Sequence, residues 1–171
     1  MGILKKITKV TKAAINEALK PESFDKGDEF ENYIRQVIFP SDRYELIHKT
    51  HSYIENKKDY IESSLYPDFL FRCKETDKEF YVEAKFRSNF YKDKVEWAKP
   101  YQLKRYKEID NKKPVFLCLG LQGKPNKPES IFIIPMQDLK YTGLYESFLR
   151  NYKFYNNKPV FSSYLWRLVN K

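Results

Sequence analysis

Hydrophobic and polar residues alternate differently in the first part of the chain and in its middle. Over 3–19, apolar residues recur every three or four positions and lysines lie off that stripe, which predicts an amphipathic helix ending near Pro21. A second helix is expected from about Asp25 to Val37, because Phe30 and Ile34 share its apolar face and acids crowd its first turn.

After this second helix the apolar period changes to two, which indicates strands. The expected strands are 43–49, 66–73, 79–87, 114–121 and 130–134. Helical spacing returns at about 98–110 and again at 137–150, and the pattern after 150 is ambiguous. Antiparallel strand runs with one helical crossover cannot build a purely parallel sheet. We therefore expect an α/β fold: a mixed central sheet flanked by helices, with an extra N-terminal helix and a C-terminal helical extension.

Length and composition fit one folded domain. The chain has 171 residues and 20.7 kDa, with 42% hydrophobic and 17% aromatic residues, enough apolar area to offset the entropy of ordering. We expect one domain over 21–171, with residues 1–20 packed on it or forming an arm. This helix could pack on its own domain, or it could contact nucleic acid or a membrane or form a dimer.

Two cysteines in unrelated segments, Cys73 and Cys118, exclude a disulfide-rich secreted scaffold. The lysine-rich start lacks the apolar core of a signal peptide, and no apolar run is long enough to span a bilayer. A cytoplasmic location without membrane contact is the expectation.

The charge is unevenly distributed. The net charge is +9, yet residues 1–85 carry −1 and residues 86–171 carry +10. A basic half suits a polyanionic partner, since each neutralised phosphate releases counterions. A lysine-rich surface without a partner explains the same count.

Candidate chemistry is concentrated in the hairpin expected from 66–73 and 79–87. In the second strand Phe80, Val82, Ala84 and Phe86 share one face, and Tyr81, Glu83, Lys85 and Arg87 share the other. With a suitable register Asp68 lies beside Glu83, so that two carboxylates and an ammonium converge. Such oxygen ligands suit Mg²⁺ or Mn²⁺.

These residues resemble the motif of the PD-(D/E)XK nuclease superfamily, which has the restriction-endonuclease-like fold. Pro67-Asp68 is followed, 15 residues after Asp68, by Glu83-Ala84-Lys85. An acid on a preceding helix, Glu31, and a polar residue on the following helix, Gln102, match two further features of the family. The resemblance covers about 25–135 and makes that region the core of a nuclease-like domain with an αβββαβ order of elements.

The resemblance implies hydrolysis of phosphodiester bonds with Mg²⁺, for which Mn²⁺ can substitute. Asp68, Glu83 and the carbonyl of Ala84 would hold the metal, and Glu31 would bind it directly or through water. Lys85 would orient or deprotonate the attacking water or stabilise the transition state, because nearby carboxylates oppose loss of its proton. Gln102 would position the phosphate or the motif residues.

Each of these residues also has a purely structural interpretation. Pro67-Asp68 could form a turn before a strand, and Glu83 with Lys85 could belong to a solvated strand face. Glu31 could interact with the helix dipole or with Arg35, and Gln102 could be an exposed helix residue. One fold that explains all five placements together favours the functional interpretation.

Aromatic residues fall into two groups. Core positions are expected for Phe39, Phe69, Phe71, Phe116, Phe132 and Trp166. After the motif strand, Tyr91, Trp97, Tyr101 and Tyr106 alternate with basic residues, a composition that could bind nucleic acid or simply form a tyrosine-rich surface. The candidate nucleic-acid contacts are Arg87, Lys92, Lys94, Lys99, Tyr101, Lys104 and Arg105.

These patterns together favour an Mg²⁺-dependent endodeoxyribonuclease. DNA is the favoured substrate, and the chain shows no separate sequence-reading module such as a helix-turn-helix. Structure-selective cleavage, as in resolvase-like members, or work within a restriction or repair system is therefore expected, with a homodimer left open. The alternatives are a catalytically silent nucleic-acid-binding module of the same fold and an interaction protein that uses exposed tyrosines.

Overall fold

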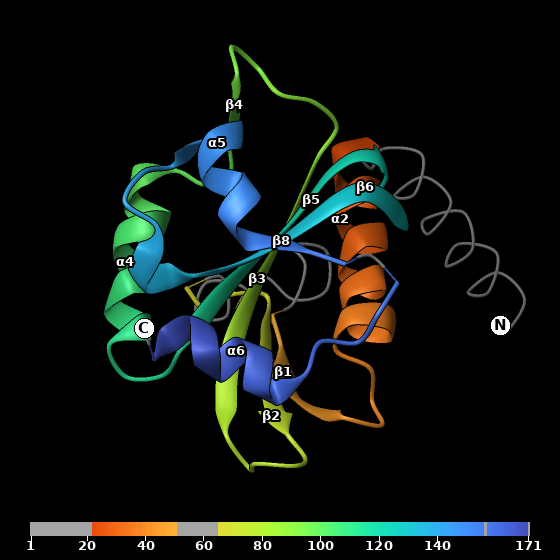
Figure 1. Ribbon diagram of the computed structural model, residues 1–171, viewed down its shortest axis with the longest axis vertical. Coiled ribbons are helices and arrows are strands. Elements are labelled where there is room, and N and C mark those ends of the chain that lie inside the picture. The colour runs from red at the N-terminus through yellow and green to blue at the C-terminus, as the bar shows by residue number, and fades with distance from the viewer. Residues whose placement is uncertain (1–21, 51–64, 156, 171) are drawn as a thin grey trace, which may run out of the picture.

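The central element of the fold is a mixed sheet with the strand order β1-β2-β3-β5-β6-β8 (Figure 1). The computed structural model describes residues 22–50, 65–155 and 157–170. The helix expected over 3–19 lies outside these residues. Within the described ranges, the strands of this sheet are β1 (Tyr44–Lys49), β2 (Phe69–Cys73), β3 (Glu79–Arg87), β5 (Val115–Lys124), β6 (Lys127–Pro135) and β8 (Lys153–Phe154).

Only the β3–β5 pair is parallel among these strand pairs, and the other neighbours are antiparallel. The parallel pair is joined across one face of the sheet by α4 (Pro100–Asp110). This is the mixed sheet with one helical crossover that the order of patterns predicts, so the expected fold class is confirmed.

Helices cover both faces of the sheet (Figure 1). The helix α2 (Glu22–Tyr33) continues into a π-helical turn, η1 (Ile34–Ile38), and its Phe30 packs on Phe86 of β3, with ring centroids 5.9 Å apart. Helix α6 (Ser162–Val169) contacts the same face, where Trp166 meets Phe80 edge-on. On the opposite face of β3, α4 covers the strand with Tyr106.

The core is mainly aromatic. Phe80 lies at its centre and contacts the rings of Phe39, Tyr44, Phe71, Phe116 and Trp166. Five of the six expected core aromatics are buried, and Trp166 is partly buried. The expected core is confirmed at these positions.

The expected helix over 137–150 is wrong. The chain instead forms a 3₁₀ turn, η2 (Met136–Asp138), a short strand, β7 (Gly143–Tyr145), and two short helical turns, α5 (Glu146–Leu149) and η3 (Arg150–Tyr152). Strand β7 pairs with β4 (Lys94–Glu96), a strand that the pattern also missed. Thr142 and Gly143 are poor helix formers, and pairing with a distant segment satisfies their backbone instead. The C-terminal extension is thus only partly helical, because β8 joins the sheet edge and only α6 is a regular helix.

Within the described ranges, none of the helices combines the length and the apolar character needed to cross a membrane.

Candidate active site

Asp68 and Glu83 lie side by side at the point where β2 begins. The expected strand over 66–73 begins only at Phe69, which pairs with Val82, so Asp68 lies just before the strand and opposite Glu83. The main-chain N–H of Asp68 donates to Oε2 of Glu83 (3.3 Å), and Oδ2 of Asp68 accepts from the main-chain N–H of Ala84 (2.8 Å). The two strands therefore hold both carboxylates in a fixed mutual position.

The carbonyl of Ala84 points to the same place. The N–H and C=O of one strand residue face the same neighbouring strand. The N–H of Tyr81 donates to Pro114 on the β5 side, whereas that of Ala84 donates to Asp68 on the β2 side. Since β2 starts beyond this point, the Ala84 carbonyl faces the space beside Asp68.

Glu83 is buried rather than part of a solvated strand face. Its exposed fraction is 1%, and its carboxylate accepts hydrogen bonds from Lys85 and from the hydroxyl of Tyr106. Burial, and then the charge of Asp68, raise the pKa of Glu83 to about 7, although Lys85 and Tyr106 act in the opposite direction. The structural interpretation of Glu83 as a solvent-facing residue is therefore wrong.

Lys85 lies on the same face as Glu83, with Nζ 2.5 Å from Oε1 of Glu83. Burial disfavours its charged form, but the negative charges of Glu83 and Asp68 outweigh this effect and raise the pKa of Lys85 above its ordinary value. In the metal-free protein Lys85 is therefore a cation, which suits stabilisation of negative charge better than removal of a proton.

Glu31 reaches the same region from α2. Its carboxylate forms an ion pair with Lys49 of β1 (3.1 Å), not the pair with Arg35 that its helix spacing suggested. Burial and the negative charge of Asp68 raise the pKa of Glu31. Asp68 thus raises the pKa of both Glu31 and Glu83, so negative charge in this region is only partly compensated.

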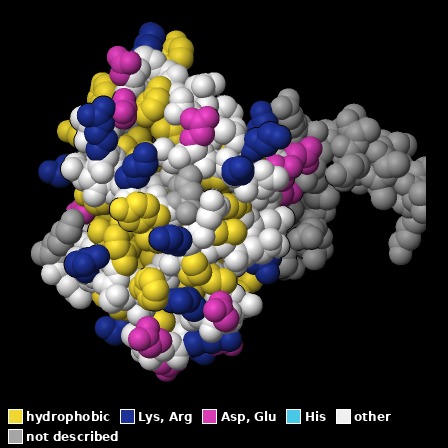
Figure 2. Space-filling view, turned by 45° about the vertical axis from the view of Figure 1, so that its right-hand side comes forward, with side chains coloured by type: hydrophobic (Ala, Val, Ile, Leu, Met, Phe, Trp, Pro, Cys, Tyr) yellow, Lys and Arg dark blue, Asp and Glu magenta, His cyan; other side chains and the backbone are white. Residues whose placement is uncertain are grey.

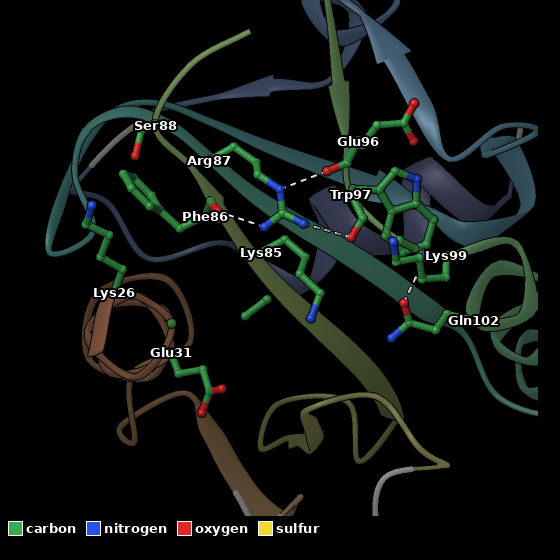
Figure 3. A pocket seen from close by; sticks show the side chains of 13 residues that line it. Lys26, Glu31, Lys85, Phe86, Arg87, Ser88, Glu96, Trp97, Lys99 and Gln102 are labelled. Atoms are coloured by element: carbon green, nitrogen blue, oxygen red, sulfur yellow. Dashed lines mark hydrogen bonds between the residues drawn. The ribbon is translucent and has the colours of Figure 1, made fainter. Parts of the chain in front are cut away.

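A pocket of about 770 Å³ opens beside these residues (Figure 3). Glu31 enters it from α2 and Gln102 from α4, with Lys85 of β3 between them. The Oε1 atom of Gln102 accepts from the N–H of Lys99 (2.9 Å) and so caps the start of α4. Gln102 is therefore partly buried, not the exposed helix residue of the structural interpretation; it caps α4 and borders the pocket.

The donor set fits one hard divalent cation. Among the described residues, no three His, Cys, Asp or Glu side chains gather closely enough to hold a metal by themselves. Mg²⁺, however, is commonly bound by one or two carboxylates together with waters and substrate phosphate oxygens. Two adjacent carboxylates with a backbone carbonyl and partly compensated negative charge meet that requirement.

Arg87 has a role that the pattern did not reveal. Its guanidinium donates to three backbone carbonyls: Glu96 (2.8 Å), Phe86 (2.9 Å) and Trp97 (3.4 Å). The bonds to Glu96 and Trp97 attach the segment before α4 to the end of β3, whereas Phe86 is the neighbouring residue of β3 itself. Arg87 therefore shapes the pocket wall that it lines.

Two of the aromatic residues considered for nucleic-acid contact are core residues. Trp97 is 0% and Tyr106 3% exposed, and their rings stack on each other. Tyr91 and Tyr101 are exposed, as a contact role requires. Among the basic candidates, Lys99 lines the pocket, Lys94 pairs with Glu96, and Lys92 lies over the ring of Tyr91.

Basic side chains do not form one continuous field on the face that Figure 2 shows. Lysines and arginines there are interspersed with hydrophobic and acidic side chains. The face in view thus carries no continuous basic patch, and the pocket brings together the basic residues Lys26, Lys85, Arg87 and Lys99 in its lining.

Two site residues escaped the sequence analysis as such. Tyr106 was considered only for base stacking, although its position four residues after Gln102 places it on the same helix face. Lys49, the partner of Glu31, ends a strand whose neighbour could not be known from the sequence. Only the spacing on α4 contained a usable signal.

No protein-family model matches the chain, and no curated protein matches it. The structure is similar to a solved structure of Hjc, a Holliday junction resolvase from the archaeal hyperthermophile Archaeoglobus fulgidus. The two share 12% sequence identity with a TM-score of 0.44, and the match covers 82% of this chain and 93% of the resolvase chain. At this identity the likeness concerns the fold, and the candidate site rests on the residues described above.

Proposed function

We propose that this protein is a nuclease that uses a divalent cation, Mg²⁺ or Mn²⁺, to hydrolyse phosphodiester bonds of DNA. The observation that carries the proposal is the convergence of Asp68, Glu83 and Lys85 at the start of β2, beside a pocket lined by further basic side chains. Binding alone would not favour two adjacent carboxylates next to a phosphate, because they repel it without a bridging cation.

The cation would be held by Asp68, Glu83 and the carbonyl of Ala84, with Glu31 as a direct or water-mediated ligand. When bound, it would polarise the phosphoryl oxygen and make a coordinated water more acidic. The reciprocal hydrogen bonds between the strands keep these oxygens in place before substrate arrives, so little reorganisation is needed.

Lys85 has the position and charge to act on the reacting phosphate. Its ammonium lines the pocket and stays protonated beside Glu83. Its proposed role is to orient the attacking water and to stabilise the negative charge that develops on the phosphoryl oxygens. The amide of Gln102, which borders the same pocket, would position the phosphate.

The DNA backbone would run along the pocket and the start of α4. Lys99 lines the pocket, and Tyr101, Lys104 and Arg105 follow on α4. The segment before α4 adds Lys92 and Lys94, and Arg87 holds that segment in place. The proposal includes a preference for branched or otherwise distorted DNA and a role in restriction or repair. It also includes a homodimer, which would allow both strands to be cut.

The test compares duplex, single-stranded and branched DNA with Mg²⁺ or Mn²⁺, with a chelator control and the Glu83→Gln and Lys85→Ala variants. Cleavage by the wild type alone that stops with chelator, while both variants still bind DNA, supports the proposal. Salt-sensitive binding without cleavage of any substrate would instead indicate the silent binding module. Absence of both cleavage and DNA binding would indicate an interaction protein that uses its exposed tyrosines.

A further inference from the structure

A second cavity lies on the same face of β3 as Glu83. Its volume is about 390 Å³, and it is lined by Tyr66, Tyr81, Arg105, Glu108, Ile109, Lys112 and Lys113. Cavities above about 300 Å³ are large enough for small ligands. None of these residues belongs to the proposed metal site.

The antiparallel course of β3 and α4 relates this cavity to the active site. Along β3, Tyr81 precedes Glu83 by one step on the same face, and Lys85 follows. Along α4 the order is reversed: Gln102 borders the first pocket, Tyr106 contacts Glu83, and Ile109 lines the second cavity. The two cavities therefore lie toward opposite ends of β3, the first beside Lys85 and the second beside Tyr81, with Glu83 between them.

An aromatic platform forms one wall of the cavity. Tyr66 stacks on Tyr81 with ring centroids 5.8 Å apart and planes at 23°, and Tyr66 is 47% exposed. Beneath it, Lys113 lies over the ring of Tyr81 and pairs with Glu79, which Arg72 also contacts. Tyr81 is thus held in place, whereas Tyr66 keeps an accessible surface two residues before Asp68.

The other wall is cationic. Arg105, Lys112 and Lys113 line it together with one acidic residue, Glu108, and Lys113 is paired with Glu79 outside the cavity lining. Among the described residues, Arg105 and Lys112 form no ion pair. The guanidinium of Arg105 lies over the rings of Tyr101 and Tyr106, and its Nε is buried without a hydrogen-bond partner. An aromatic surface next to cations that have no ion-pair partner suits a ligand with one flat ring and a negative charge.

We propose that this cavity is a subsite for one unpaired nucleotide of the substrate strand, with its base on Tyr66 and its phosphate held by Arg105 and Lys112. The inference rests on the proposed nuclease function and adds a substrate class to it. A base paired inside a duplex has both faces covered by its neighbours and cannot stack on a side chain without leaving the helix. The subsite would therefore select DNA with a single-stranded or flipped nucleotide next to the cleaved bond.

The experiment measures binding without cleavage, in chelator, with fluorescently labelled DNA: a single strand, a blunt duplex, and a duplex with a short single-stranded gap. The variants are Tyr66→Ala, Tyr66→Phe and Lys112→Ala. Matched controls are Tyr155→Ala and Lys158→Ala, another exposed tyrosine with a lysine over its ring, neither of which lines the two cavities. Thermal melts of every variant verify the fold.

Loss of one base stack should weaken binding of the single strand and the gapped duplex by roughly tenfold in Tyr66→Ala. Tyr66→Phe should bind nearly as the wild type, because a ring remains. Lys112→Ala should weaken the same two substrates, and the blunt duplex and both controls should change less than twofold.

Three results would overturn the inference. If Tyr66→Ala and Lys112→Ala bind the gapped duplex as tightly as the wild type does, the subsite does not exist. The same holds if the folded variants lose equal affinity for all three substrates. Cleavage of blunt duplex by a wild type that does not bind single strands removes this inference and leaves the nuclease intact. A wild type that binds no DNA removes both.

Discussion

The hydroxyl of Tyr106 donates a hydrogen bond to the buried carboxylate of Glu83, and thereby connects α4 to the motif strand β3. Tyr106 is itself 3% exposed and stacks on Trp97, so its hydroxyl is held in position by core packing. This bond lowers the pKa of Glu83 against the larger effects of burial and Asp68.

Tyr106→Phe should therefore raise the pKa of Glu83 above about 7. Since Glu83 must be ionised to bind a cation, the rising limb of the pH–rate profile should move to higher pH. Loss of the donor to a buried acceptor should also cost about 1–3 kcal/mol of stability. Tyr155→Phe, at an exposed position outside the proposed DNA contacts, is the control. A reduced rate with an unshifted profile would contradict the link to Glu83.

The stability of the metal-free protein should fall as the pH rises from about 4.5 to about 7. The folded pKa of Glu83 is raised above its ordinary value, so folding favours the protonated form and loses that advantage as the carboxyl ionises. Lys85 remains charged throughout this range and does not alter the slope.

Mg²⁺ should offset this loss. A cation at a hundred times its dissociation constant stabilises the folded state by about 2.7 kcal/mol. Thermal melts at pH 5 and pH 8, with Mg²⁺ or with chelator, should show the larger increase at pH 8, where the carboxylates are ionised. Equal increases at both pH values would mean that the cation binds elsewhere.

Asp68→Asn should stabilise the metal-free protein while abolishing its function. The charge of Asp68 raises the pKa of both Glu31 and Glu83, so its removal relieves repulsion. An amide oxygen can still accept from the N–H of Ala84. We expect a gain of about 1 kcal/mol at pH 8 in chelator and a loss of cleavage of roughly a hundredfold or more. A less stable variant would show that the acids are better compensated than the contacts indicate.

Lys85→Met should lower the cleavage rate by about 10²–10³-fold, the effect of removing one group that stabilises transition-state charge. Stabilisation by Mg²⁺ should survive, because Lys85 is not a proposed ligand. Lys127→Met, at the exposed first residue of β6, is the control for loss of one positive charge. Loss of Mg²⁺ stabilisation in Lys85→Met would assign Lys85 a role in assembling the site.

Gly120→Ala should destabilise the protein and displace Glu31. A Cβ at Gly120 of β5 would lie 2.4 Å from Cε2 of Phe30, the ring that packs α2 on the sheet. Such overpacking costs about 1–3 kcal/mol. Denaturant titration should show that Phe30→Leu partly rescues Gly120→Ala, because the shorter side chain vacates that space. Strictly additive losses would contradict direct contact between the two positions.

The hairpin and its motif could be read from the sequence because strand periodicity is local. Strand 79–87 was placed with its observed ends, and the two faces of β3 separate Phe80 and Val82 from Glu83 and Lys85 as alternation requires. The sequence predicted that Asp68 lies beside Glu83 if the hairpin has a suitable register. The observed register has this property, because it pairs Phe69 with Val82. The candidate site could thus be predicted as a set of residues.

What covers each face could not be predicted. Alternation shows that Glu83 and Lys85 point away from the aromatic core, but α4 determines that Glu83 is buried, with Tyr106 against it. In the same way Arg87 looked like a surface cation and instead holds the segment before α4. The short strands β4 and β7 lack a pattern of their own, because each is stabilised by pairing with the other.

The sequence by itself determined the order of the main elements, the face of β3 that carries the chemistry and the set of acidic and basic residues involved. Only the tertiary structure decided which side chains contact one another in and around the site. Glu31 contacts Lys49, Glu83 contacts Tyr106, and Tyr66 stacks on Tyr81. Periodicity follows from backbone geometry within a few residues, whereas these contacts join segments that come together only when the sheet and its helices pack.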